Sequence, residues 1–373
     1  MSLVRAVKRC IVSQIAAVDR LLHKGDAAHA VALGEVRNFL LLQHSAALGT
    51  AIHATPLIPA LRNAIPGCRI AVAASGFSLD LLRHNPGIDC LIETPSPLHD
   101  LRGAVSVLRQ RNPFSGSPYA VLTSVGNERT RVAAQAVLSG AAVRVGFTLV
   151  PQLYRIPLAF DRALSQIANN LRIVEALGHS SKHFEPEMFY SESDLAGARE
   201  TLANAGVQQE QPVAVFITQT SVTQRKSWRG ERFREAARFL ARQYGAHIVF
   251  VGTAVESAAI DALRGGLDFA TTSVAGRTNL PQLAALMSLS SVGLTLDTGP
   301  MHVGRAAGLP MVIIAPAWSP PIEWLPLGND RFRIFKNADM ASAPVNYIID
   351  EVSVDEVTAA LTELLTRYPR RGL

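Results

Sequence analysis

Short apolar runs alternate with longer helical patterns along most of this chain, and this alternation constrains the fold more than any other feature. The first series of apolar runs lies at 36–42, 69–74, 88–92, 119–123 and 143–145, with helical patterns at 50–63, 78–84, 98–109 and 127–138 between them. Runs of about five apolar residues are typical of parallel strands buried on both faces. The repetition predicts a doubly wound, parallel α/β sheet with right-handed crossovers.

The same alternation starts again after residue 212. Strand patterns lie at 213–217, 247–251, 270–274, 292–296 and 311–314, with helical patterns at 232–243, 255–263, 280–287 and 299–307. Residues 147–190 hold Pro151, Pro157 and Pro186 and little strand pattern, so we expect the connection between two domains there. Two such sheets predict a ligand-binding cleft between the carboxyl ends of their strands.

The predicted fold class is therefore α/β, with two Rossmann-like, doubly wound parallel-sheet domains. We expect an N-terminal extension at 1–35, a first Rossmann-like domain at 36–185, a second at 186–345 and a C-terminal helix within 346–373. The extension has an apolar stripe at helical spacing and a basic opposite face. The stripe is Val4, Val7, Ile11, Ile15, Val18 and Leu22, and the basic residues are Arg5, Lys8, Arg9, Arg20 and Lys24. Such a helix either docks on protein or lies on an anionic membrane.

The composition of the chain indicates which classes of binding partner to expect. The 36 Lys and Arg exceed the 30 Asp and Glu, which gives a net charge of +6 and favours anionic partners such as nucleotides, phosphates or a membrane surface. Basic residues are not interleaved with aromatic ones, so we expect no nucleic-acid partner. The three cysteines are too few and scattered for a disulfide framework or a zinc site, and they favour a reducing, cytoplasmic setting. No apolar run is long enough to predict a transmembrane helix.

The strongest local signal is Asp297-Thr298-Gly299-Pro300-Met301-His302, between a predicted strand and a predicted helix. Asp297 or Thr298 can cap the helix, and Gly299 lets a ligand approach the backbone. Free N–H groups at the helix N-terminus suit a diphosphate, and His302 lies one turn further along. The alternative interpretation is an ordinary capped turn of an α/β protein.

Two further polar segments follow predicted strands. The first holds Thr218, Thr220, Ser221, Thr223, Arg225 and Lys226, which are hydroxyl donors and cations suited to phosphate oxygens. The second is 43–50, where His44 is followed by the small residues Ser45 and Gly49 and by Thr50. Small residues let backbone amides lie close to a ligand. A solvated loop and a plain tight turn are the respective alternatives.

The sequence lacks the motifs that are typical of several classes of enzyme. The chain has no G-x-G-x-x-G of a dehydrogenase, no P-loop of a kinase and no G-x-S-x-G elbow of a hydrolase. It has no Asp-x-Asp and no cluster of His or Cys, so we expect no metal site.

Together these segments resemble glycosyltransferase family 9, the ADP-heptose:lipopolysaccharide heptosyltransferases, from about residue 36 to 330. The resemblance rests on Asp297–His302, on Lys226-Ser-Trp228 and on Val249-Phe-Val-Gly252 with Glu256 after it. Further matching segments are Leu48-Gly49, Thr55-Pro56, Leu61-Arg62 and Ser273-Val-Ala-Gly276-Arg-Thr278-Asn-Leu280.

The resemblance implies the GT-B architecture and metal-independent sugar transfer with inversion, without a cofactor. The second domain would bind a nucleotide-diphosphate sugar, with ADP-heptose as the family default, and the first a lipid-linked or glycan acceptor. Lys226 and the amides near Thr298 and Gly299 would stabilise the leaving diphosphate. Asp297 would bind sugar hydroxyls and His302 would position the diphosphate. The other substrate-binding residues implied are Ser45, Gly49, Thr220, Ser221, Thr223, Gly252, Glu256 and Pro300.

The chain departs from the family at its general base. Family members carry Arg-x-Ser-x-x-Gly-Asp, whose Asp is the base, and the matching residues here are His44, Ala46, Gly49 and Thr50. A threonine hydroxyl does not accept a proton from an alcohol near neutral pH. Either His44 or another nearby group takes this role, or the acceptor is acidic, or the protein binds a sugar nucleotide without efficient turnover.

The sequence thus predicts an inverting, metal-independent glycosyltransferase of bacterial surface-glycan synthesis, cytoplasmic or peripheral on the inner membrane. The alternative is a weak or inactive paralogue that binds a sugar nucleotide as a sensor or partner subunit. A nucleotide-sugar epimerase or hydrolase, which would consume the donor without an acceptor, is a third interpretation.

Overall fold

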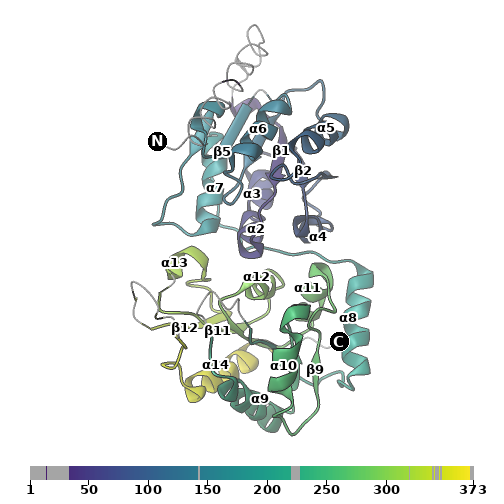
Figure 1. Cartoon of the computed structure of the whole chain (residues 1–373), viewed down its shortest axis with the longest axis vertical. Coiled ribbons are helices and arrows are strands. Elements are labelled where there is room, and N and C mark those ends of the chain that lie inside the picture. The colour runs from purple at the N-terminus through teal and green to yellow at the C-terminus, as the bar shows by residue number, and fades with distance from the viewer. Residues whose placement is uncertain are drawn as a thin grey trace. The chain divides into compact units, whose positions relative to one another are not determined.

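The computed structural model describes residues 33–141, 143–219, 227–318, 320–337 and 347–369, together with Gln14, Met340 and Pro344. The chain divides after Pro186 into two compact units, which are called unit 1 (Met1–Pro186) and unit 2 (Glu187–Leu373) below. Figure 1 shows strands and helices alternating along the chain in both units.

Unit 1 is built on a six-stranded sheet in the order β3-β2-β1-β4-β5-β6, in which every neighbouring pair is parallel. The strands are β1 (Asn38–Gln43), β2 (Arg69–Ala74), β3 (Cys90–Glu93), β4 (Ala120–Thr123), β5 (Val143–Phe147) and β6 (Ile156–Leu158). The helices are η2 (Leu33–Glu35), α2 (Leu48–Ala54), α3 (Leu57–Ala64), α4 (Phe77–Leu82), α5 (Leu101–Arg111), α6 (Thr130–Leu138), η3 (Pro151–Leu153) and α7 (Gln166–Ala176). One core cluster packs Leu40 and Leu42 of β1 with Leu108 of α5 and Val132 of α6, and α7 packs against α2 and α3.

Unit 2 repeats this plan with the order β12-β11-β10-β7-β8-β9, again with parallel neighbours. Its strands are β7 (Val213–Ile217), β8 (His247–Phe250), β9 (Thr271–Ser273), β10 (Val292–Leu296), β11 (Met311–Ile314) and β12 (Phe332–Phe335). Its helices are α8 (Glu192–Asn204), α9 (Gly230–Tyr244), η4 (Ala254–Glu256), α10 (Ser257–Arg264), α11 (Leu280–Ser288), α12 (Gly299–Ala306), α13 (Pro321–Trp324) and α14 (Val354–Arg367). Helices α14 and α9 pack together (Figure 1), and the main core cluster of the unit joins them to the sheet.

Both sheets have the Rossmann strand order, which reverses direction at the first strand of each unit. In unit 1 this switch point lies between β1 and β4, and in unit 2 it lies between β7 and β10. Open α/β sheets bind ligands outside the carboxyl ends of the strands at such a point. The loops that follow these four strands are therefore the first places to look for a functional site.

The predicted fold class is confirmed, since both units contain a parallel, Rossmann-like sheet with alternating helices. The expectation of an irregular connection over 147–190 is wrong in part, because β6 completes the sheet of unit 1 and α7 covers it. The helical pattern over 50–63 is two helices. Pro56 has no N–H to continue the first one, and Thr55 instead donates both its N–H and its hydroxyl to the carbonyl of Ile52, at 3.0 and 2.8 Å.

Apart from Gln14 and 33–35, the predicted N-terminal extension lies outside the described residues. No helix in the described parts of the chain is both long and apolar enough to cross a membrane.

Candidate functional site

The switch point of unit 2 is formed by the loop after β10, which leads directly into α12. Asp297 is only 3% exposed there, and Thr298 is the extended N-cap residue of α12 (φ −143°), followed by Gly299 and Pro300 in the first turn. The Thr298 side chain makes no capping hydrogen bond, contrary to the expectation from sequence. Its buried hydroxyl has no hydrogen-bond partner among the described residues. The start of α12 thus has neither a side-chain cap nor a partner for this hydroxyl, and an uncapped helix N-terminus is a suitable place for an anion.

His302 lies one turn into α12 and is 4% exposed. Its ring packs against the ring of Trp324 in α13, with the centroids 5.9 Å apart and the planes at 55°. Trp324 was not among the residues that sequence reasoning selected, because nothing in the local sequence connects it with a helix some twenty residues earlier. The contact fixes the imidazole near the N-terminal end of α12.

The polar loop after β7 is the other half of this switch point. Thr220, Ser221, Thr223 and Lys226 lie outside the described residues, so their predicted roles stay predictions. Both ends of the loop are described. Thr218, the residue after β7, is buried, and the carbonyl of Ser227 accepts a hydrogen bond from the N–H of Ile349 at 2.9 Å. The exit of the loop is therefore tied to the segment before α14.

The loop after β8 holds Gly252 and Glu256. Glu256 accepts a hydrogen bond from the N–H of Thr253 at 2.7 Å, in a capping box that starts η4. A Cβ on Gly252 would lie 2.6 Å from Cδ1 of Ile260, so a larger residue there would displace the end of that buried side chain. The structure thus gives both residues a structural role, while the ligand-binding role stays a prediction.

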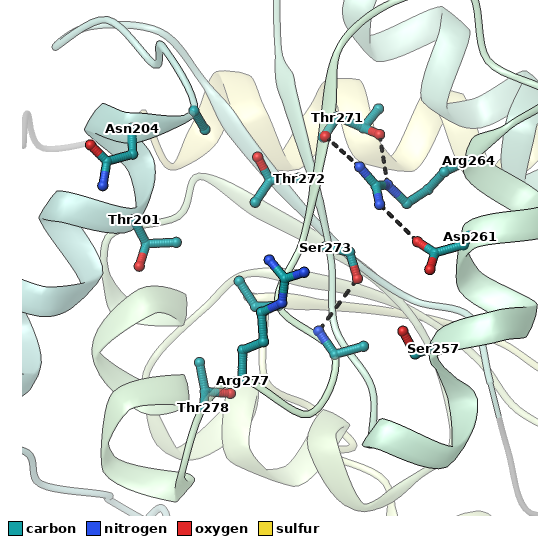
Figure 2. A pocket seen from close by; sticks show the side chains of 13 residues that line it. Thr201, Asn204, Ser257, Asp261, Arg264, Thr271, Thr272, Ser273, Arg277 and Thr278 are labelled. Carbon is teal, nitrogen blue, oxygen red and sulfur yellow. Dashed lines mark hydrogen bonds and ion pairs between the residues drawn. The ribbon is translucent and has the colours of Figure 1, made fainter.

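A cavity of about 470 Å³ opens at the β9 edge of unit 2, and Figure 2 shows its lining. Its walls come from α8, α10, β9 and the segment 274–278, and they are rich in hydroxyl groups. Arg264 is held there by Asp261 and by the carbonyl of Thr271, both at 2.8 Å, whereas Arg277 extends into the cavity. Among the described residues, none of the substrate-binding residues implied by the sequence lines this cavity, whereas Ser273, Arg277 and Thr278 of the family-like segment do.

In unit 1, a buried asparagine joins the loops after β1 and β4. Asn127 is 1% exposed, and its Oδ1 accepts a hydrogen bond from the N–H of His44 at 2.7 Å. Its Nδ2 donates to Oε1 of Gln43 and to Oγ of Ser124, both at 3.0 Å. Asn127 was missed at the sequence level, although its place just after a predicted strand was the available signal. The network holds the two sides of the switch point together.

Position 50 lies in the first turn of α2, beside this network. Thr50 is 6% exposed, and a Cβ built on Gly126 would lie 2.4 Å from its methyl carbon, so the methyl group packs directly on the backbone of Gly126. Gly126 has a φ of +87°, which favours glycine. Gly49 is buried in the same turn, and Oγ of Ser45 accepts a hydrogen bond from the N–H of Ala47 at 3.3 Å. The residue at the family's Asp position therefore faces the loop after β4.

His44 is a poor proton acceptor. It is 5% exposed, and its Nδ1 shares a hydrogen bond of 2.9 Å with the hydroxyl of Ser75. Burial lowers the pKa of His44 to about 4, against a smaller opposing effect of the Gln135 side chain. A general base works best with a pKa near the working pH. The geometry therefore gives the proposed catalytic role of His44 little support.

This low pKa has a consequence for stability. As the pH decreases from 6.5 to 4, the unfolded chain takes up a proton at His44 that the folded chain does not take up. The free energy of unfolding therefore decreases over this range, by about 3 kcal/mol in all. We expect His44→Gln to lose less stability over this range in urea unfolding. The exposed His99 offers the control His99→Gln, which should follow the wild type. Equal pH slopes for His44→Gln and the wild type would contradict the assignment.

The described residues contain no group of three or more His, Cys, Asp or Glu side chains arranged as metal ligands.

The sequence was compared with protein families and with proteins of known function. The model of Glycosyltransferase family 9 (heptosyltransferase) matches residues 144–342, which is more than half of the chain. Lipopolysaccharide heptosyltransferase 3 of Escherichia coli is 23% identical over 303 residues, which cover 77% of this chain and 86% of that protein. The match to the lipopolysaccharide core heptosyltransferase OpsX of Haemophilus influenzae is 29% identical over 117 residues, and it covers 31% of this chain and only 33% of OpsX.

Solved structures show the same fold. A glycosyltransferase family 9 protein of Veillonella parvula is similar with a TM-score of 0.79 and 20% identity, over 91% of this chain and 99% of that one. The ADP-heptose lipopolysaccharide heptosyltransferase II of E. coli gives 0.71 and 20%, over 88% and 98%. The matched family region includes β10, α12 and the loop after β7, where unit 2 has its switch point. The chain therefore belongs to glycosyltransferase family 9, the family of the heptosyltransferases, and it is a glycosyltransferase.

Proposed function

We propose that this protein transfers a sugar, heptose by family default, from a nucleotide-diphosphate sugar to a lipopolysaccharide or other bacterial surface-glycan acceptor. The transfer would proceed with inversion and without a metal ion. The observation that carries the proposal is the start of α12, where Asp297 and the unsatisfied hydroxyl of Thr298 precede a helix N-terminus without a side-chain cap. A relative of known structure, heptosyltransferase II, is named for ADP-heptose and lipopolysaccharide.

The chemistry follows from where charge develops. The acceptor oxygen attacks C1 of the donor sugar as the bond from C1 to the diphosphate breaks, and the diphosphate leaves with the electron pair. Preorganised N–H dipoles and cations that face this developing charge lower the barrier. In unit 2 the amide groups at the start of α12 and Lys226 would supply them, His302 would position the diphosphate and Asp297 would bind sugar hydroxyls.

Binding of the acceptor falls to unit 1 in this proposal, at the β1–β4 switch point. We place the protein in the cytoplasm, with residues 1–35 in contact with the inner membrane. Deletion of residues 1–30 should then move the protein from the membrane fraction to the soluble fraction.

The test is transfer in the absence of metal. With ADP-heptose and a panel of heptose-free and heptose-bearing lipopolysaccharides, we expect turnover that persists in excess EDTA, with the β-configured or α-configured product opposite to that of the donor. The readouts are ADP release, the mass of the product glycan, and NMR of its anomeric carbon and proton for the configuration. Donor that binds without any acceptor-dependent release would contradict the proposal, and release without an acceptor would favour a hydrolase or epimerase.

The second candidate is a sugar-nucleotide-binding paralogue without turnover. The observation that favours it is Thr50 at the family's base position, packed by its methyl group on Gly126. It predicts tight binding of a sugar nucleotide with no transfer to any acceptor in the panel.

A further inference from the structure

The proposed reaction needs a proton acceptor in unit 1, and neither Thr50 nor His44 is suited to the role. The acidic side chains near the carboxyl edge of the described sheet can be compared by how close their strands lie to the β1–β4 switch point. Glu93 on β3 and Asp161 after β6 belong to the two edge strands, and Asp80 in α4 pairs with Arg83 at 3.1 Å. Glu128 instead follows β4, the strand that lies beside β1 across the switch point.

Glu128 and Thr50 both contact the same glycine. Oε1 of Glu128 accepts a hydrogen bond from the N–H of Gly126 at 2.8 Å, while the methyl group of Thr50 packs on the α-carbon side of Gly126. The Glu128 carboxylate and position 50, where the family has its Asp, therefore both lie against Gly126.

The local backbone holds Glu128 firmly. Its carbonyl accepts a hydrogen bond from the N–H of Leu149 at 2.8 Å, and the preceding Asn127 is locked into the buried network with His44 and Gln43. The side chain is half-buried, and its second carboxylate oxygen has no hydrogen bond to a described residue. One oxygen thus fixes the carboxylate, and the other is available to a substrate hydroxyl.

We infer that Glu128 is the general base of this glycosyltransferase and takes the place of the family's Asp from the neighbouring loop. The inference rests on the proposed function. As the acceptor oxygen bonds to C1 of the sugar, its proton passes to the free oxygen of the Glu128 carboxylate. The C1–O bond to the diphosphate breaks with its electron pair on the leaving group, and Glu128 later releases the proton to water.

Glu128→Gln tests this role with little structural change, because the amide oxygen of Gln still accepts the hydrogen bond from Gly126. General-base catalysis contributes roughly 10²–10⁴-fold, so we expect kcat with ADP-heptose and lipopolysaccharide acceptors to fall by about 10²-fold or more. The KM for ADP-heptose should change less than about threefold. Glu128→Asp should retain more activity than Glu128→Gln.

The matched control is Glu93→Gln, which removes an exposed carboxylate from the same edge of the sheet and should keep wild-type activity. In the Glu128→Gln background, Thr50→Asp puts a carboxylate back at the family position and should raise kcat. An active wild type with Glu128→Gln within about threefold of it overturns this inference and leaves the proposed function standing. A wild type that binds ADP-heptose and transfers to no acceptor overturns both.

Discussion

Lys226→Ala is expected to lower kcat by about 10²–10³-fold in heptose transfer, with a much smaller loss of affinity for ADP. The leaving diphosphate gains negative charge in the transition state, and removal of one preorganised donor that faces such charge costs roughly this factor. Steady-state kinetics with ADP-heptose, together with equilibrium binding of ADP, separates the effect on kcat from that on binding.

Two variants make the result specific to Lys226. Lys226→Arg keeps the charge but not the point-like ammonium group, so partial activity is expected. Lys182→Ala removes an exposed lysine near the end of unit 1 and should leave kcat unchanged. A Lys226→Ala enzyme as fast as the wild type would show that amide dipoles alone stabilise the leaving group.

The described flanks of this loop support such a role. Lys226 itself lies outside the described residues, but the next residue, Ser227, bonds through its carbonyl to Ile349. Arg229 forms an ion pair with Asp350 two residues later. A loop whose exit is fixed at two points can hold a cation at the switch point with little loss of conformational freedom on binding.

The strands of both sheets were largely predictable because each is a self-contained apolar run. The predicted bounds of β2, β7, β10 and β11 are the same as the observed ones. Strand β6 was missed because it is three residues long and contains Pro157, which an edge strand tolerates and a central strand does not. Helix α8 was missed because only two of its residues, Ala198 and Leu202, are buried, so its apolar residues show little helical period in the sequence.

The segments of the candidate site were predictable, but the contacts within them were not. Asp297 and Thr298 follow a strand in the sequence, so their place at the sheet edge could be deduced. The ring contact between His302 and Trp324 and the approach of Thr50 to Gly126 depend on tertiary packing between distant segments. Glu128 has no local motif and becomes a candidate only once β4 is seen to lie beside β1.

Trp228 shows how packing changes the interpretation of a motif residue. In the sequence it belongs to the Lys226-Ser-Trp228 segment, which resembles a donor-binding motif. In the structure it is 4% exposed, its ring meets Phe233 edge-on with centroids 4.9 Å apart, and its Nε1 donates to the carbonyl of Val352 at 3.0 Å. Trp228 is thus a core residue that anchors the exit of the loop after β7 to the segment before α14.

We therefore expect Trp228→Ala to destabilise unit 2 by about 3–5 kcal/mol, the usual cost of truncating a buried tryptophan. Trp228→Phe should cost only about 1 kcal/mol, because the ring remains and Arg232 also donates to the carbonyl of Val352, at 2.7 Å. All three tryptophans of the chain, at 228, 318 and 324, lie in unit 2, so the two that remain in each variant report its unfolding by fluorescence. A loss below about 1 kcal/mol for Trp228→Ala would mean that the loop is not anchored through this ring, and the expected position of Lys226 would lose its main structural support.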